Sequence, residues 1–161
     1  MSNESNPNPA IERLKVFDPD AVEGVLVFRG ETSVLIRADR LLKVAEFLRD
    51  EMDLSFKYLS DVTAVDYFPN DPRFETIYHL YSIEHNKRLR LKVKLGSDDP
   101  TVDSMVPIWP GAQAFECELY DLFGIHFTNH PDLRRLLMPE DWEGYPLRKD
   151  YPVQGNITRW Q

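Results

Sequence analysis

Three extended runs between Phe56 and Leu95 constrain the fold of this 161-residue chain more than any other feature. They read FKYLSDVTAVDYF, FETIYHLYSIEH and KRLRLKVKL, and they are separated by the turn-rich PNDPR and by Asn86. Runs that are rich in β-branched and aromatic residues and bounded by turn residues are typical of consecutive strands. We therefore expect an antiparallel meander, onto which the rest of the chain packs.

The third run alternates between apolar and basic side chains. The apolar set is Leu89, Leu91, Val93 and Leu95, and the basic set is Arg88, Arg90, Lys92 and Lys94. Because successive side chains of a strand point to opposite faces, one face is apolar and the other is a row of cations. This row is either a docking face for an acidic partner or a solvated face that pairs with acids such as Glu75 and Glu84. We prefer the second interpretation.

The segments before the meander carry hairpin and helix patterns. GVLVFRG and TSVLIRA predict a hairpin that turns at Gly30-Glu31. A short helix is predicted over residues 11–17, and a second helix over residues 39–52, with Asp39 as its cap. The apolar face of the second helix consists of Leu41, Leu42, Ala45, Leu48 and Met52.

A third helix is predicted after the meander, from Pro110 through Phe123, because proline favours the first position of a helix. Gly124 suits the left-handed residue that ends it, with the apolar Ile125 folded back behind. Together these elements predict an α+β fold, a two-layer domain with helices packed on a mixed, largely antiparallel sheet.

Three segments are expected along the chain. Residues 1–10 are rich in Asn, Ser and Pro and predict a disordered tail. Residues 11–130 form the α+β core domain. Residues 131–161 form an extended C-terminal arm, since prolines recur there too often for a helix.

Composition excludes several classes of protein. A formal net charge of -8 argues against a dedicated nucleic-acid binder. The single cysteine, Cys117, excludes an internal disulfide and a self-contained iron–sulfur cluster, and it indicates a reducing, cytosolic environment. No apolar run reaches the roughly 18 residues of a membrane span, and the N-terminus lacks a signal-peptide pattern. Phosphate-binding glycine loops are absent too.

Residues 116–132 offer candidates for chemistry. Glu118 and Asp121 lie three apart on the third helix, a spacing that suits either an acid–base pair or salt bridges to arginines downstream. We prefer the salt bridges. A zinc site from His126, His130, Cys117 and Asp132 lacks paired ligands, so His130 is better read as a turn residue whose ring bonds a backbone or carboxylate group. Cys117 lies between two glutamates, which disfavours a nucleophilic thiolate.

The run HPDLRRLLMPEDWEGYPLRKDYP is the most unusual segment. It combines apolar and aromatic side chains with arginines. Ordering about 20 extended residues costs on the order of 20 to 40 kcal/mol of backbone entropy. Burying those side chains returns roughly 15 to 25 kcal/mol, and only if every one of them is covered. The run is therefore either loosely held or completed by another protein. We prefer the second interpretation, because Arg and aromatic residues are enriched at interfaces.

The stretch ECELYDLFGIHFTNHPDLRRLL, followed by MPEDWEGYPLRKDYP, resembles the C subunit of the bacterial NADH–quinone oxidoreductases, the 30 kDa subunit family of respiratory complex I. The one departure that stands out is Cys117, where the family carries Arg. The resemblance implies a scaffold subunit of the hydrophilic arm of a proton-pumping complex that passes electrons from NADH to quinone. A subunit of a related complex fed by ferredoxin or another donor, and a free-standing carboxylate enzyme, stay open as alternatives.

The resemblance also implies the setting of the chain. FMN, iron–sulfur clusters and quinone are expected on other subunits, with no catalytic, cofactor-binding or metal-binding residues on this chain. Expected partners are the quinone-site D subunit, from a separate chain, and neighbouring iron–sulfur subunits, at the cytoplasmic side of the bacterial inner membrane. The expected interface residues are Glu116, Glu118, Asp121, Gly124, His130, Pro131, Leu133, Arg134, Trp142, Tyr145, Leu147, Arg148, Lys149 and Asp150.

Overall fold

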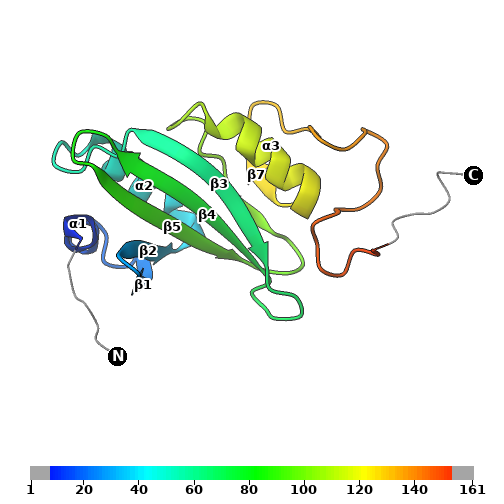
Figure 1. Cartoon of the computed structure of the whole chain (residues 1–161), viewed down its shortest axis with the longest axis horizontal. Coiled ribbons are helices and arrows are strands. Elements are labelled where there is room, and N and C mark those ends of the chain that lie inside the picture. Colours follow the sequence, from blue (N-terminus) through cyan, green and yellow to red (C-terminus); the bar gives the residue numbers. More distant parts are fainter. Residues whose placement is uncertain (1–7, 154–161) are drawn as a thin grey trace, which may run out of the picture.

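A five-stranded mixed sheet lies at the centre of the molecule, in the order β1-β2-β5-β4-β3 (Figure 1). The computed structural model describes residues 8–153 of the chain. Neighbouring strands are antiparallel except for β2 and β5, which are parallel. The strands are β1 (Val22–Phe28), β2 (Glu31–Ile36), β3 (Tyr58–Asp66), β4 (Phe74–Ser82) and β5 (Lys87–Leu95). The expected meander and the α+β fold are confirmed.

Helices flank this sheet, with α2 behind it and α3 beside β3 in Figure 1. The helices are α1 (Pro9–Phe17), α2 (Leu41–Asp50) and α3 (Ala112–Phe123), and a 3₁₀ turn, η1 (Ala38–Arg40), precedes α2. A second, two-stranded parallel sheet pairs β6 (Thr101–Asp103) with β7 (His126–Thr128). No helix among residues 8–153 has the length and apolar character to cross a membrane.

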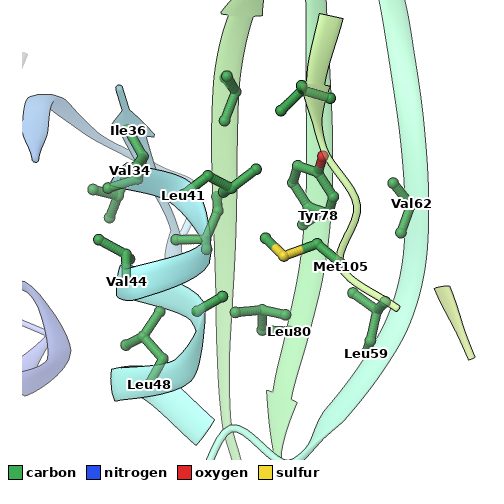
Figure 2. Close-up of a cluster of buried hydrophobic side chains, with 14 of the residues drawn as sticks. Val34, Ile36, Leu41, Val44, Leu48, Leu59, Val62, Tyr78, Leu80 and Met105 are labelled. Atoms are coloured by element: carbon green, nitrogen blue, oxygen red, sulfur yellow. The ribbon is translucent and has the colours of Figure 1, made fainter. Parts of the chain in front are cut away.

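The core lies between α2 and the sheet (Figure 2). Leu41, Val44 and Leu48, spaced by one helical turn, are fully buried on one side of α2. They pack in the same cluster as Tyr78 and Leu80 of β4, with side chains of β2, β3 and β5 around them. This face of the sheet is therefore apolar and closed.

The cation row of β5 points to the other face, as the alternation predicts. Lys92 forms an ion pair with Glu75 at 2.8 Å, and Arg90 pairs with Glu31 of β2. The expected partner Glu84 is wrong, because Glu84 pairs with Lys57 instead, at 2.6 Å. Arg90 and Lys92 are thus paired with acids of the same sheet, and Arg88 and Lys94 are exposed to solvent. This arrangement favours the second interpretation, a solvated face that pairs with acids.

Three local expectations are wrong at their boundaries. The second helix spans Leu41–Asp50, and Asp39 does not cap it because its carboxylate bonds the Arg37 guanidinium at 3.0 Å. Met52 lies beyond the helix and is 83% exposed. The third helix begins at Ala112 because Pro110 and Gly111 form a turn before it.

The expected N-terminal tail is too long. Residues 1–7 lie outside the described residues, but residues 8–10 belong to α1 and its cap. The Asn8 side chain accepts a hydrogen bond from the Ala10 amide at 3.1 Å, which satisfies one of the free N–H groups at the start of the helix.

Candidate functional site

The arm, residues 131–153, follows the end of α3 and contains neither helix nor strand. Helix α3 ends at Gly124, whose φ of 72° is the left-handed conformation that glycine adopts without strain, and β7 lies between Gly124 and the arm. A Cβ at Gly124 would lie 2.5 Å from Tyr145 Cε2 and 2.6 Å from Arg148 Nη2. Gly124 therefore both ends the helix and lets the arm lie directly against it.

Asp121 of α3 holds the beginning of the arm. Its fully buried carboxylate accepts hydrogen bonds from the backbone N–H groups of Leu136, Leu137 and Met138 at 3.0, 2.7 and 2.9 Å. Arg135 donates a further hydrogen bond at 2.8 Å. Burial by itself would raise the pKa of Asp121, but these donors outweigh it and hold the pKa below its usual range.

Asp66, at the end of β3, holds the far end of the arm together with Arg73. The Arg73 guanidinium donates two hydrogen bonds to Asp66, at 2.9 and 2.8 Å, and two more to Asp150 of the arm, at 3.0 and 2.6 Å. Asp66 also accepts from the backbone N–H of Lys149 at 2.8 Å. The Arg73 hydrogen bonds hold the pKa of Asp66 far below its usual range.

Arg148 fixes the arm between these two carboxylates. Its Nε donates to the carbonyl of Phe123 at 2.6 Å, and its guanidinium lies 4.5 Å from the ring centroid of Tyr145 and 5.1 Å from that of Phe74. Desolvation, with the charge of Arg73 nearby, lowers the pKa of Arg148. A backbone hydrogen bond of 3.0 Å from Leu147 to Leu122 completes this section.

Three leucines of the arm are exposed to solvent. Leu137 is 63% exposed, Leu147 52% and Leu136 46%. An ordered backbone that leaves several large apolar side chains in water marks a surface for protein contact.

Glu118 and Asp121 do not form an acid–base pair, the less favoured of the two interpretations. Glu118 is exposed, whereas Asp121 is buried and fully engaged by hydrogen-bond donors. The alternative, a salt bridge to a downstream arginine, is confirmed for Asp121 by Arg135. Asp121 is thus a structural acceptor.

Glu116 is the second buried acid of α3, and it joins that helix to the segment after β6. It accepts hydrogen bonds from Ser104 Oγ and from the backbone N–H of Met105, both at 2.6 Å. Burial raises the pKa of Glu116 to about 7, although these two donors act in the opposite direction.

His130 has the turn role that the sequence indicates. Its Nδ1 accepts from the Asp132 N–H at 3.1 Å, so Nε2 carries the proton and donates to the carbonyl of Gln113 at 3.2 Å. Cys117 is buried, and its sulfur lies 3.3 Å from the Asp132 carbonyl and 3.8 Å from His130 Nε2. His126 is exposed and apart, and no three potential ligands among residues 8–153 are grouped to hold a metal.

The expected interface residues divide by exposure. Glu116 and Asp121 are buried and accept hydrogen bonds within the fold. The half-buried ones are Gly124, His130, Leu133, Trp142, Tyr145 and Arg148; the exposed ones are Glu118, Pro131, Arg134, Leu147, Lys149 and Asp150. Sequence reasoning missed Asp66 and Arg73. Both sit at hairpin ends about 80 residues before the arm segment they bind, and no local pattern marks them.

A pH-dependent contribution to stability is expected from Glu116. Its pKa is raised in the folded chain from 4.5 to about 7, so between these values the folded state binds more protons than the unfolded state. Stability from this group is therefore full below about pH 4.5 and falls by roughly 3 kcal/mol as pH rises through 7. In Glu116→Gln this decline should vanish.

The measurement is denaturant unfolding of both proteins at several pH values. The exposed Glu118→Gln, on the same helix, is the control and should keep the wild-type slope. An unchanged slope in Glu116→Gln would show that another group titrates.

Comparisons with known proteins agree on one family. A sequence model described as "Respiratory-chain NADH dehydrogenase, 30 Kd subunit" matches residues 34–157. The NADH-quinone oxidoreductase C subunit of Roseiflexus sp. (strain RS-1) is 50% identical over 143 residues, which cover 89% of this chain and 82% of that protein. The C subunit of Citrifermentans bemidjiense is 47% identical over 148 residues, covering 92% of this chain and 91% of its own.

Solved structures share the fold. A trypsin-resistant fragment (1-134) of Nqo5 matches with a TM-score of 0.61 and 28% identity, covering 77% of this chain and 99% of the fragment. A chain of the membrane-bound sulfane sulfur reductase, an archaeal respiratory membrane complex, matches with a TM-score of 0.73 and 25% identity, covering 90% of this chain and 85% of that one.

Proposed function

This chain belongs to the family of the 30 kDa subunit of the respiratory-chain NADH dehydrogenase, and from that membership we propose that it works as the C subunit, a non-catalytic scaffold in the hydrophilic arm of a NADH–quinone oxidoreductase. The structure of the arm is the observation that supports the scaffold role. Its backbone is held by two buried carboxylates while Leu136, Leu137 and Leu147 remain in solvent. Such a strip presents a fixed apolar surface to partner subunits.

A scaffold role accounts for how the acids are used. Both oxygens of Asp121, the candidate for proton transfer, accept hydrogen bonds from donors of the arm. Both oxygens of Asp66 accept from Arg73, and one of them also accepts from Lys149 of the arm. A general acid or base needs a proton that it can exchange with a substrate. These carboxylates order the chain instead.

The cofactors of the complex are proposed to be FMN, iron–sulfur clusters and quinone, all bound by other subunits. Cys117 supports this assignment, because a cluster is usually held by about four cysteines and the single thiol here is buried against Asp132.

The partners of the arm are proposed to be the quinone-site D subunit and neighbouring iron–sulfur subunits, and the proton-pumping complex attaches this chain to the cytoplasmic side of the bacterial inner membrane. The exposed leucines suit the apolar centre of such an interface. Arg134, Lys149 and Asp150 suit its polar rim.

A related complex with a different electron donor is the second candidate. The likeness to a chain of the sulfane sulfur reductase, with a TM-score of 0.73, favours a fold that serves more than one respiratory complex. The higher identity to the C subunits of NADH-quinone oxidoreductases favours NADH as the donor.

Introducing charge on the exposed arm is expected to break assembly without unfolding the chain. In Leu137→Lys/Leu147→Lys, both changed side chains are more than half exposed, so the melting temperature of the free protein should stay the same. Tagged protein purified from its host should lose the subunits that accompany the wild type in native mass spectrometry. NADH:quinone activity of that fraction should fall with them.

Val16→Lys is the matched control, since Val16 is 85% exposed on α1 and outside the arm. It should retain the partners and the activity. If the double variant assembles as the wild type does, the arm is not the docking surface. If the wild-type assembly forms but does not oxidise NADH, the second candidate replaces the first.

A further inference from the structure

A buried cluster of polar groups lies where α3 meets the turn into the arm. The side chains of Glu116 on α3 and of His130, after β7, are both 0% exposed, and Glu116 Oε2 lies 3.9 Å from His130 Nε2. Strand β7 lies beside α3 in Figure 1, and this packing brings the two side chains together. A buried carboxyl group without a cation is a group whose charge can change near neutral pH.

The imidazole of His130 attaches the start of the arm to α3 through both of its nitrogens. Nδ1 accepts the Asp132 N–H at 3.1 Å, which closes the turn that leads into the arm. Nε2–H faces acceptors on adjacent turns of α3: the Gln113 carbonyl at 3.2 Å, the Cys117 sulfur at 3.8 Å and the Glu116 carboxyl at 3.9 Å. Because sulfur is a weak acceptor, the choice for this N–H lies between the carbonyl and the carboxyl.

These two acceptors differ in how they respond to pH. The Gln113 carbonyl is neutral at every pH, whereas the carboxyl of Glu116 becomes a charged acceptor when it loses its proton. A hydrogen bond to a charged acceptor is about twice as strong as one between neutral groups. A movement of about 1 Å would bring Nε2 within hydrogen-bond distance of Glu116 Oε2.

We propose that Glu116 and His130 form a proton-controlled switch at the start of the arm. When Glu116 releases its proton to solvent, the Nε2–H of His130 moves from the Gln113 carbonyl to the carboxylate. The imidazole is rigid, so the Asp132 N–H that is bonded to its Nδ1 moves with it. The charge of an acid inside the fold is thus transmitted to the first residues of the arm.

Glu116 is the member of the cluster whose charge changes. Ser104 Oγ and the Met105 N–H, from the segment after β6, both donate to its carboxyl group at 2.6 Å. Burial opposes ionisation more strongly than these donors favour it, and it raises the pKa of Glu116 to about 7. A carboxylate oxygen has two lone pairs, so Oε2 can accept from His130 while it still accepts from Ser104.

The other titratable groups around Glu116 do not replace His130 in this role. On β4, burial and the charges of Glu116 and Asp103 raise the pKa of Tyr78, so its hydroxyl stays neutral. The thiol of Cys117 donates to the Asp132 carbonyl at 3.3 Å. Among residues 8–153 no Lys or Arg side chain forms an ion pair with Glu116, and the nearest side-chain N–H that can turn to it is that of His130.

The switch operates inside the free chain and does not depend on the proposed subunit function. If the arm docks on partner subunits, docking becomes sensitive to pH, and only this consequence rests on that function. The test below uses the full chain alone, so its failure leaves the docking proposal standing.

Nuclear magnetic resonance of the isotope-labelled full chain across neutral pH tests the switch. As the pH rises through about 7, the Nε2–H resonance of His130 should move downfield, because its acceptor becomes charged. The Asp132 amide resonance should move with the same midpoint. In Glu116→Gln both changes should disappear, and the exposed Glu118→Gln should behave as the wild type does. Resonances that do not move in the wild type would overturn the proposal, and so would a transition that persists in Glu116→Gln.

His130→Asn gives a second, reciprocal readout. The asparagine oxygen can still accept the Asp132 N–H and close the turn, but no side-chain N–H then reaches Glu116. Ionised Glu116 loses a donor, so the midpoint of its own carboxyl resonance should rise by about one pH unit. A midpoint that stays at the wild-type value would show that the imidazole does not donate to the carboxylate, and the switch would be wrong.

Discussion

Asp121→Ala is expected to release the beginning of the arm and to lower the free energy of unfolding by about 3 to 5 kcal/mol. The substitution removes the acceptor of three backbone N–H groups and leaves the Arg135 guanidinium beside an apolar cavity. Hydrogen bonds to a charged group are among the strongest in proteins, and a buried acceptor that serves several donors is hard to replace with water. Denaturant unfolding measures the loss.

Amide hydrogen exchange locates the same effect. Protection at Leu136, Leu137 and Met138 should fall in Asp121→Ala, while protection in the β3–β4 hairpin should persist to within the global change in stability. Asp132→Ala is the control, because its carboxylate is exposed and pairs with the equally exposed Arg134. Wild-type protection of the three arm amides in Asp121→Ala would mean that another contact holds the arm.

Arg73→Met is expected to cost a similar 3 to 5 kcal/mol at neutral pH, because it leaves Asp66 buried as a charge without its cation. Asp66 is 3% exposed and Arg73 7% exposed, so water does not compensate for the loss. Asp150 loses its partner at the same time, which should free the far end of the arm.

The loss of stability in Arg73→Met should become smaller as the pH falls. In the wild type the pKa of Asp66 is held below its unfolded value, so its stabilisation is present above about pH 4 and is lost as the pH falls further. The difference between Arg73→Met and the wild type should therefore be largest near neutrality and shrink in acid. Arg134→Met, at the exposed ion pair with Asp132, should change stability by less than about 1 kcal/mol. A constant difference across pH would mean that the variant acts through packing alone.

The sheet was predictable because patterns within short stretches of the sequence specify its strands. The alternation in residues 87–95 determines which side chains face the core, and Gly124 marks the end of α3 by its own backbone preference. The helix starts were less predictable. Asp39 had an arginine two residues away that competed for its carboxylate, and a capping pattern does not reveal such a competitor.

The site was predictable only in its location. Sequence reasoning interpreted the C-terminal run as an interface segment in preference to a flexible tail, and it placed Asp121 near a downstream arginine. It did not find Asp66 and Arg73, since their link to Lys149 and Asp150 spans most of the chain. It also failed to separate Glu116 from Glu118. Residues two apart point to different sides of a helix, and what packs on each side decides which one is buried.

The two carboxylates that hold the arm have a consequence for how quickly this chain finds its partners. A segment that folds only on contact must surrender its conformational entropy at that moment, which weakens binding and slows it. Here the ordering cost falls on the free chain, because Asp121 and Asp66 fix the backbone from inside the same domain. The arm is preorganised, so docking should be close to a rigid-body encounter with a modest entropy penalty, and its rate should be set by diffusion and orientation.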